Sequence, residues 1–175
     1  MFKKIIIAIT LTLLTMQAQA VVQGTLNPTS TGSFDVTVTI PNEVRISGLA
    51  DVDFGTYPAT GNLDSNYDLC IYSNMPGATY DITASGDGAG SAFTIAYLAN
   101  TIPYVVNWND TTGTVGKSQL TATVSVPQTG ANQQTTDCSV GGDSANLEIE
   151  INGADISGKP NGTYTGTLTL LIEAN

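Results

Sequence analysis

The stretch PNGTYTGTLTLLIEAN, residues 160–175, decides the fold more clearly than any other part of the chain. Threonines form one side of a period-two pattern, and the other side is Tyr164, Gly166, Leu168, Leu170 and Ile172. Such alternation predicts a half-buried β-strand. The sequence ends two residues after this strand. An all-β domain that finishes in this way either closes its sheet or leaves the edge of its last strand open.

Short alternating or β-branched runs recur through the rest of the chain and predict further strands. Turn clusters rich in Gly, Asn, Ser and Thr separate them, and no segment after residue 20 has a helical period. About 155 residues after the first 20 fit one domain. The pattern predicts an all-β, immunoglobulin-like sandwich, with strands near residues 33–40, 43–47, 68–73, 79–84, 92–98, 102–108, 119–126, 146–151 and 164–172.

Residues 1–20 have the pattern of a secretory signal peptide. Lys3 and Lys4 precede an apolar run, and Ala18-Gln19-Ala20 supplies the small residues of a cleavage site. The alternative is a membrane anchor, but the run is too short to span a bilayer and nothing basic follows it. We therefore expect a mature chain from Val21 with no membrane span, soluble or assembled outside the inner membrane.

The charge of the chain argues against nucleic-acid binding. All fifteen acidic residues follow residue 20, whereas only Arg45, Lys117 and Lys159 remain as bases there. A surface with this excess of negative charge repels phosphate backbones and anionic lipid. The acidic residues are spread singly or in pairs, as on solvated strand faces and loops. We expect no nucleic-acid partner and no cofactor.

The two cysteines predict a single disulfide between Cys70 and Cys138. An exported chain with an even cysteine count normally oxidises its thiols. Closing a loop of about 70 residues contributes on the order of 4 kcal/mol in the chain-entropy account. Since the sequence has no histidine and no C-x-x-C pair, we expect no metal site. The Gly-rich or turn stretches 63–68 and 85–91 do not match a calcium-loop pattern.

Two segments precede the predicted domain of residues 41–175. Residues 21–32 are polar and predict a flexible arm. Residues 33–40 show the strongest alternation in the protein, with one face made of Phe34, Val36, Val38 and Ile40. Pro41 then breaks the pairing, because proline has no backbone donor for a ladder. From the pattern alone, residues 33–40 are either a strand given to another molecule or the first strand of a complete sandwich.

Four stretches of the chain resemble subunits of chaperone–usher pili, of the archaic spore coat U-like and alpha-type fimbrial kinds. They are residues 34–49 (FDVTVTIPNEVRISGL), 51–57 (DVDFGTY), 70–88 (CIYSNMPGATYDITASGDG) and 160–175. Together they span roughly half of the chain after residue 20. Spore coat U-like domains usually carry a cysteine in the first strand, where this chain has residues 43–46.

The resemblance implies a sandwich that lacks its last strand. In these pilins the N-terminal extension of the next subunit fills the resulting groove, a donor-strand exchange. It implies Phe34, Val36, Val38 and Ile40 as donor side chains, and residues 164–172 as one wall of the acceptor groove. The implied partners are identical or related pilin subunits, a periplasmic chaperone and an outer-membrane usher. The implied function is a fibre subunit for adhesion or biofilm formation.

An enzyme is not expected, because without histidine no Ser-His-Asp or Cys-His arrangement can form. The carboxylate pair Asp51/Asp53 is interpreted as the start of a strand, and the pair Glu148/Glu150 as solvated carboxylates on an outward strand face. The rival function is a monomeric secreted module that binds carbohydrate or another surface ligand. Its platform would be Trp108 with nearby tyrosines, although a lone Trp at the end of an apolar strand is more often partly buried core.

Overall fold

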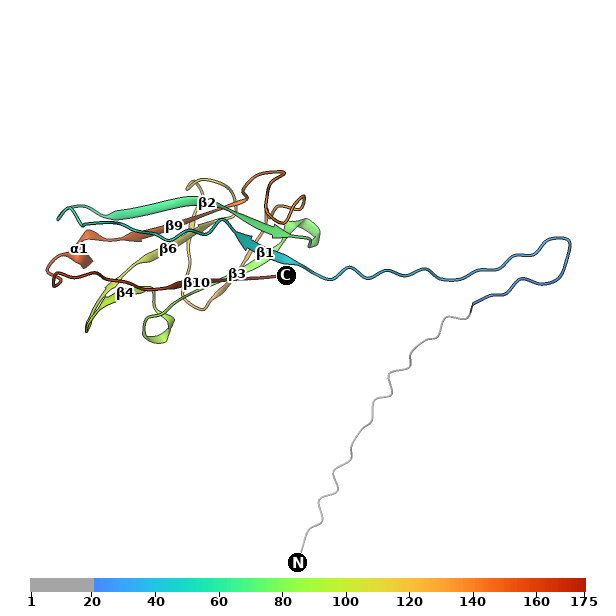
Figure 1. Cartoon of the computed structure of the whole chain (residues 1–175), viewed down its shortest axis with the longest axis horizontal. Helices are drawn as coiled ribbons and strands as arrows, with labels where there is room; N and C mark the ends of the chain where they lie inside the picture. The colour runs from blue at the N-terminus through green and yellow to red at the C-terminus, as the bar shows by residue number, and fades with distance from the viewer. Residues whose placement is uncertain (1–20) are drawn as a thin grey trace, which may run out of the picture. The chain divides into compact units, whose positions relative to one another are not determined.

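A computed structural model describes residues 21–175, so the predicted signal peptide lies outside the described part. The chain divides into two units, the first ending at Ile40 and the second running from Pro41 to Asn175. Figure 1 draws the second unit as a β-sandwich.

In the first unit, the described residues 21–40 make almost no regular structure. Val22 and Ser33 form one antiparallel bridge, with two N–H···O bonds of 3.0 Å. Beyond Ser33, residues 34–40 belong to no sheet. Their four apolar side chains are largely in solvent, with exposed fractions of 75% for Phe34, 86% for Val36, 84% for Val38 and 76% for Ile40.

The second unit contains two main antiparallel sheets and a hairpin (Figure 1). The five-stranded sheet has the order β1 (Val44–Ser47), β2 (Leu63–Ser73), β9 (Ala145–Ile151), β6 (Val105–Asn109) and β7 (Ser118–Gln119). The three-stranded sheet has the order β10 (Leu168–Glu173), β3 (Tyr80–Gly86) and β8 (Ser125–Gln128). The hairpin pairs β4 (Thr94–Tyr97) with β5 (Asn100–Pro103). Short helical turns are η1 (Pro76–Ala78), η2 (Ala89–Ser91) and α1 (Gly153–Ile156).

The core lies between the two sheets and follows the period-two rule. Ile82 and Ala84 of β3 are fully buried, as are Leu69 and Ile71 of β2. These residues belong to one apolar cluster that also takes in side chains of β6 and β9. Alternate residues of facing strands thus fill the space between two layers. The predicted all-β, immunoglobulin-like sandwich is confirmed.

Most strands predicted in the second unit are present, with shifted ends, but the prediction for residues 119–126 was wrong. Residues 119–126 were expected to form one strand, whereas β7 ends at Gln119 and β8 begins at Ser125. Between them Thr123 takes a left-handed backbone conformation (φ 64°), and its N–H donates to the Ala84 carbonyl at 2.8 Å. This turn interrupts the strand, although the alternating sequence pattern continues through it.

Three further differences from the sequence-based expectations are local. The run 102–108 is divided between β5 and β6. Residues 51–53 begin no strand, because the Asp53 carboxylate accepts the Gly55 N–H at 2.8 Å and caps a turn. The helical turn α1 was not predicted; the Asn152 side chain caps it by accepting the Ala154 N–H at 2.9 Å.

Candidate functional site

The sandwich has one border at which the end strands of both sheets lie next to each other. β1 is the end strand of the larger sheet and pairs only with β2. β10 is the end strand of the smaller sheet and pairs with β3 on one side, from Leu168↔Gly86 to Glu173↔Asp81. β1 and β10 contact each other. No strand among residues 21–175 pairs with the outer side of β10.

The strand order relates this border to the strand positions of the immunoglobulin fold. That fold places strands A, B, E and D in one sheet and C, F and G in the other. Here β1, β2, β9 and β6 take the A-B-E-D order, and β10 pairs with β3 as F pairs with C. The G position, beside β10, is taken by none of the described residues. A strand edge without a partner presents unpaired N–H and C=O groups.

Apolar side chains line this border and are only partly covered. Leu168, Leu170 and Ile172 of β10 point to the core side, as do Val44 and Ile46 of β1. All five pack against the core cluster, yet each stays half-buried, in contrast to the fully buried centre of the sandwich. A further strand in the G position would complete their burial.

Two of the five predicted acceptor residues lie beside β4. The Tyr164 ring lies 5.7 Å from the Tyr97 ring, and its hydroxyl donates to the Pro160 carbonyl at 3.1 Å. Gly166 is exposed, and a Cβ at this position would come within 2.6 Å of the Thr94 carbonyl oxygen. Gly166 thus permits close approach to β4. The border beside β1 holds Leu168, Leu170 and Ile172 of the predicted set.

Sequence reasoning missed Asn74, which holds the start of the second unit. Its side-chain oxygen accepts the Glu43 N–H at 2.8 Å, and its Nδ2 donates to the Pro41 carbonyl at 2.8 Å. The Asn74 N–H also donates to the Glu43 carbonyl at 3.1 Å. We call these three hydrogen bonds the Asn74 clamp. They fix the backbone of residues 41–43 directly before β1. An Asn beside a Pro-Gly turn was visible in the sequence, but its partners 31 and more residues away were not.

The residues proposed for the rival binding platform are inside the core. Trp108 is 1% exposed, and its Nε1 donates to the Tyr80 hydroxyl at 3.2 Å. Burial raises the pKa of Tyr80 well above its usual value, an effect that the Trp108 hydrogen bond only partly opposes. Trp108 therefore ties the two sheets together, and the proposal that it forms a surface platform was wrong.

The carboxylate pair on β9 also differs from the prediction. Glu148 was expected in solvent, but it is 7% exposed, bridges to Lys117 and accepts the Asn107 amide at 2.9 Å. Glu150 is half-buried and accepts the Asn62 amide at 2.9 Å. Both carboxylates have local partners on the sheet. Among residues 21–175 no group of three or more acidic, His or Cys side chains is placed to hold a metal ion.

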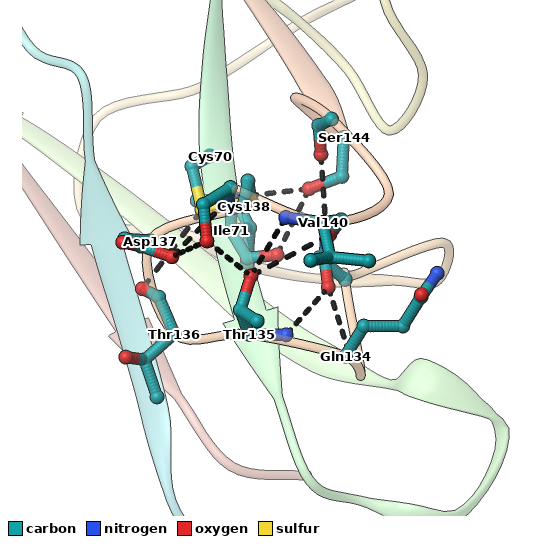
Figure 2. Close-up of a disulfide and its surroundings, with 12 residues drawn as sticks. Cys70, Ile71, Gln134, Thr135, Thr136, Asp137, Cys138, Val140 and Ser144 are labelled. Atoms are coloured by element: carbon teal, nitrogen blue, oxygen red, sulfur yellow. Dashed lines mark hydrogen bonds between the residues drawn. A yellow bond between two sulfur atoms is a disulfide. The ribbon is translucent and has the colours of Figure 1, made fainter.

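The predicted disulfide is present. Cys70 lies on β2 and Cys138 in the loop between β8 and β9, with a Cα–Cα distance of 5.7 Å, and both residues are buried. Figure 2 shows the bond fastening this loop against β2. The described residues contain no other cysteine.

Comparisons with known proteins bear on the fold. The sequence matches no protein-family model and no curated protein. The structure is similar to a chain of a chaperone–tip adhesin complex described as vital for the activation of CFA/I fimbriae biogenesis, with a TM-score of 0.54 and 12% sequence identity. The likeness covers 77% of this chain but 41% of that chain. At this identity the likeness shows a shared fold alone.

Within residues 21–175, no helix has both the length and the apolar character that crossing a bilayer requires.

Proposed function

We propose that this protein is a non-enzymatic structural subunit of a surface fibre, a pilus or fimbria, that polymerises by donor-strand complementation. The observation that carries the proposal is a matched pair of features. Residues 33–40 form an alternating apolar segment in solvent, and the sandwich has a half-buried apolar border where no strand of residues 21–175 takes the G position. The segment has an apolar face without a cover, and the border has a strand edge without a partner.

The two features agree in period and in chemistry. Phe34, Val36, Val38 and Ile40 repeat every second residue, as do the core-facing side chains of β10. A strand added beside β10 would pair its backbone with the β10 edge and direct alternate side chains into the core. Full burial of each such side chain is worth roughly 1.5–3 kcal/mol. Four of them would hold a subunit firmly in a fibre.

The donor segment is proposed to enter a second copy of the chain. Only residues 41–43 separate Ile40 from β1, and the Asn74 clamp holds them. Folding residues 33–40 back along their own β1 would need a tight turn in these same residues. Forming that turn would break the clamp, so donation to another subunit is favoured.

The remaining parts of the proposal follow the family resemblance and the fimbrial fold. Before assembly, a periplasmic chaperone would lend a strand to the same border, and an outer-membrane usher would exchange it for residues 33–40 of the next subunit. The path would run through the inner membrane, the periplasm and then the cell surface. The fibre would serve adhesion or biofilm formation. A monomeric binding module with Trp108 as its platform is not favoured, since Trp108 is buried.

The test compares two aspartate substitutions in the full chain, Val36→Asp and Thr37→Asp. Val36 belongs to the apolar face of the donor segment, whereas Thr37 would remain in water on the other face. Burying an unpaired charge is costly, so Val36→Asp should abolish polymers and Thr37→Asp should leave them. Polymers are read as ladders on gels run without boiling, and folding by circular dichroism.

A folded Val36→Asp protein that no longer polymerises would support the donor role. The proposal fails if Val36→Asp polymerises like the parent chain. It fails equally if the parent chain stays monomeric when produced together with a chaperone and an usher.

A further inference from the structure

A polar hollow of about 570 Å³ lies between two loops of the sandwich, and its lining includes no residue of the β1–β10 border. One wall is the loop after β6, with Asp110 and Thr111. The other is the loop between β8 and β9, with Gln133, Gln134 and Asp143. No residue of β1 or β10 lines it. We call it the polar hollow.

The buried side chain of Asn132 and the disulfide fix the shape of the second wall. The Asn132 amide donates to the carbonyls of Val140 at 2.7 Å and Gly142 at 3.1 Å, and its oxygen accepts the Gln134 N–H at 2.7 Å. The disulfide then holds the same loop at Cys138. Figure 2 shows the Gln134 side chain extending away from the disulfide. The wall is therefore formed before any ligand arrives.

The first wall is held in the same manner. Asn109 is 5% exposed, and its Nδ2 donates to the carbonyls of Gly113 at 2.7 Å and Val115 at 2.9 Å. The Gly113 N–H donates in turn to the Asp68 carboxylate at 2.7 Å. A loop fixed by its own buried amide loses little entropy on binding a ligand.

Two glycines are required in the polar hollow, one between the two walls and one within the second wall. Gly130 and Gly141 have φ values of 77° and 89°, a conformation that other residues rarely adopt. A Cβ at Gly130 would lie 2.7 Å from the Asp110 carbonyl oxygen, and one at Gly141 would lie 2.9 Å from the Gln134 amide nitrogen. Gly130 therefore permits the close approach of the two walls, and Gly141 permits the close packing of the second wall on itself.

The side chains of the polar hollow restrict the chemistry of a ligand. Thr111, Gln134 and Asp143 make no side-chain hydrogen bond to any described residue, so their hydroxyl, amide and carboxylate groups are available. Neither Lys nor Arg lines the hollow, and two carboxylates do, which disfavours anions. The lining contains no aromatic or large aliphatic side chain, so an apolar ligand would gain little.

We propose that the polar hollow binds a neutral, hydroxyl-rich ligand, a neutral saccharide. Its hydroxyls would donate to the carboxylates of Asp110 and Asp143 and would accept from the Gln134 amide. This proposal goes beyond fibre assembly and does not depend on it, because the polar hollow and the β1–β10 border share no residue.

The test measures binding of glucose, galactose, mannose and N-acetylglucosamine to the full chain, with sialic acid as an anionic probe. Saturation-transfer NMR in EDTA detects binding and excludes metal-mediated contacts. The affinity of the best probe is then compared between Gln134→Ala and Gln119→Ala. Gln134 lines the hollow, and Gln119 is an exposed glutamine on β7. Losing one hydrogen bond should weaken binding about fivefold to tenfold in Gln134→Ala only.

Binding of a neutral sugar with that difference between the variants supports the site. The inference is overturned if none of the four neutral sugars binds at about 10 mM, a concentration that reveals even millimolar affinity. It is overturned as well if Gln134→Ala and Gln119→Ala bind alike, or if sialic acid binds as well as the neutral sugars. None of these results depends on whether the chain polymerises.

Discussion

Residues 34–40 and strand β3 have the same sequence pattern and opposite surroundings. In β3, Ile82 and Ala84 are fully buried, because strands of the opposite sheet face them. In the first unit, Val36 and Val38 are more than four-fifths exposed. Alternation therefore encodes a strand with an apolar face, but it does not encode which surface covers that face. The predictions below test how far the two regions differ.

The largest difference is expected for an aspartate placed on each apolar face. Ile82→Asp would bury a charge in the core without a partner and should unfold the domain, with a loss of several kcal/mol. Val36→Asp should leave the unfolding temperature of a monomeric chain within about 2 °C of the parent, because Val36 contributes nothing to the core. Thermal unfolding by circular dichroism measures both. Equal destabilisation by the two substitutions would show that residues 33–40 belong to the domain's own core.

The disulfide should stabilise the second unit alone. Replacing both Cys70 and Cys138 by alanine should lower its unfolding free energy by about 4 kcal/mol, as expected for a loop of this length. The first unit contains no cysteine, so the double substitution should not change it. Urea unfolding gives the free energy, with the parent chain in reducing buffer as the control. A loss below about 1 kcal/mol would mean that the loop between β8 and β9 stays ordered without the bond.

The two faces of β10 should respond differently to truncation. Leu170 packs half-buried on the core side, whereas Leu171 is 50% exposed on the other side. We expect Leu170→Ala to cost about 2 kcal/mol, near the low end for buried leucines, and Leu171→Ala less than about 0.5 kcal/mol. In assembled fibres the effect of Leu170→Ala should grow, because a donor strand would complete its burial. Similar costs in monomer and fibre would indicate that the border stays uncovered.

The Asn74 clamp lies within the second unit, at its first residues, so its removal should have a smaller, local effect. Asn74→Ala deletes two hydrogen bonds to residues 41–43 and should cost about 1 kcal/mol. The exchange rate of the Glu43 amide hydrogen should rise. Asn66→Ala, at an exposed position of β2, is the matched control and should change neither quantity. Unchanged exchange at Glu43 would contradict the role of the clamp.

The smallest expected effect is a response to acid at Asp68. Hydrogen bonds from the Gly113 N–H and then the Asn146 amide lower the pKa of this carboxyl. A lowered folded-state pKa adds stability that is present above the usual value of about 3.9 and is lost as pH falls through the folded value. The Gly113 amide chemical shift should follow this titration. Asp68→Asn should abolish it; a shift that titrates in that variant would point to another group.

Several features of the molecule were predictable because they depend on neighbours in the sequence. Period-two runs located β1, β3, β9 and β10, and the even cysteine count, in a chain predicted to be exported, predicted the disulfide. The burial of Glu148 was not predictable, because its ion-pair partner is Lys117, which lies 31 positions away in the sequence. The turn at Thr123 and the close contact of Gly166 with β4 likewise depend on approaching segments.

The sequence by itself determined that this chain makes many short antiparallel strands, one disulfide and one alternating segment ahead of the domain. Local side-chain alternation and thiol chemistry suffice for these. Only the tertiary structure decided that β10 lies at an edge beside β1, that Trp108 faces inward, and that two loops enclose a polar hollow. The physical reason is that pairing and burial depend on which distant segments meet, and an alternating strand carries the same pattern whether its face is covered, half-covered or in water.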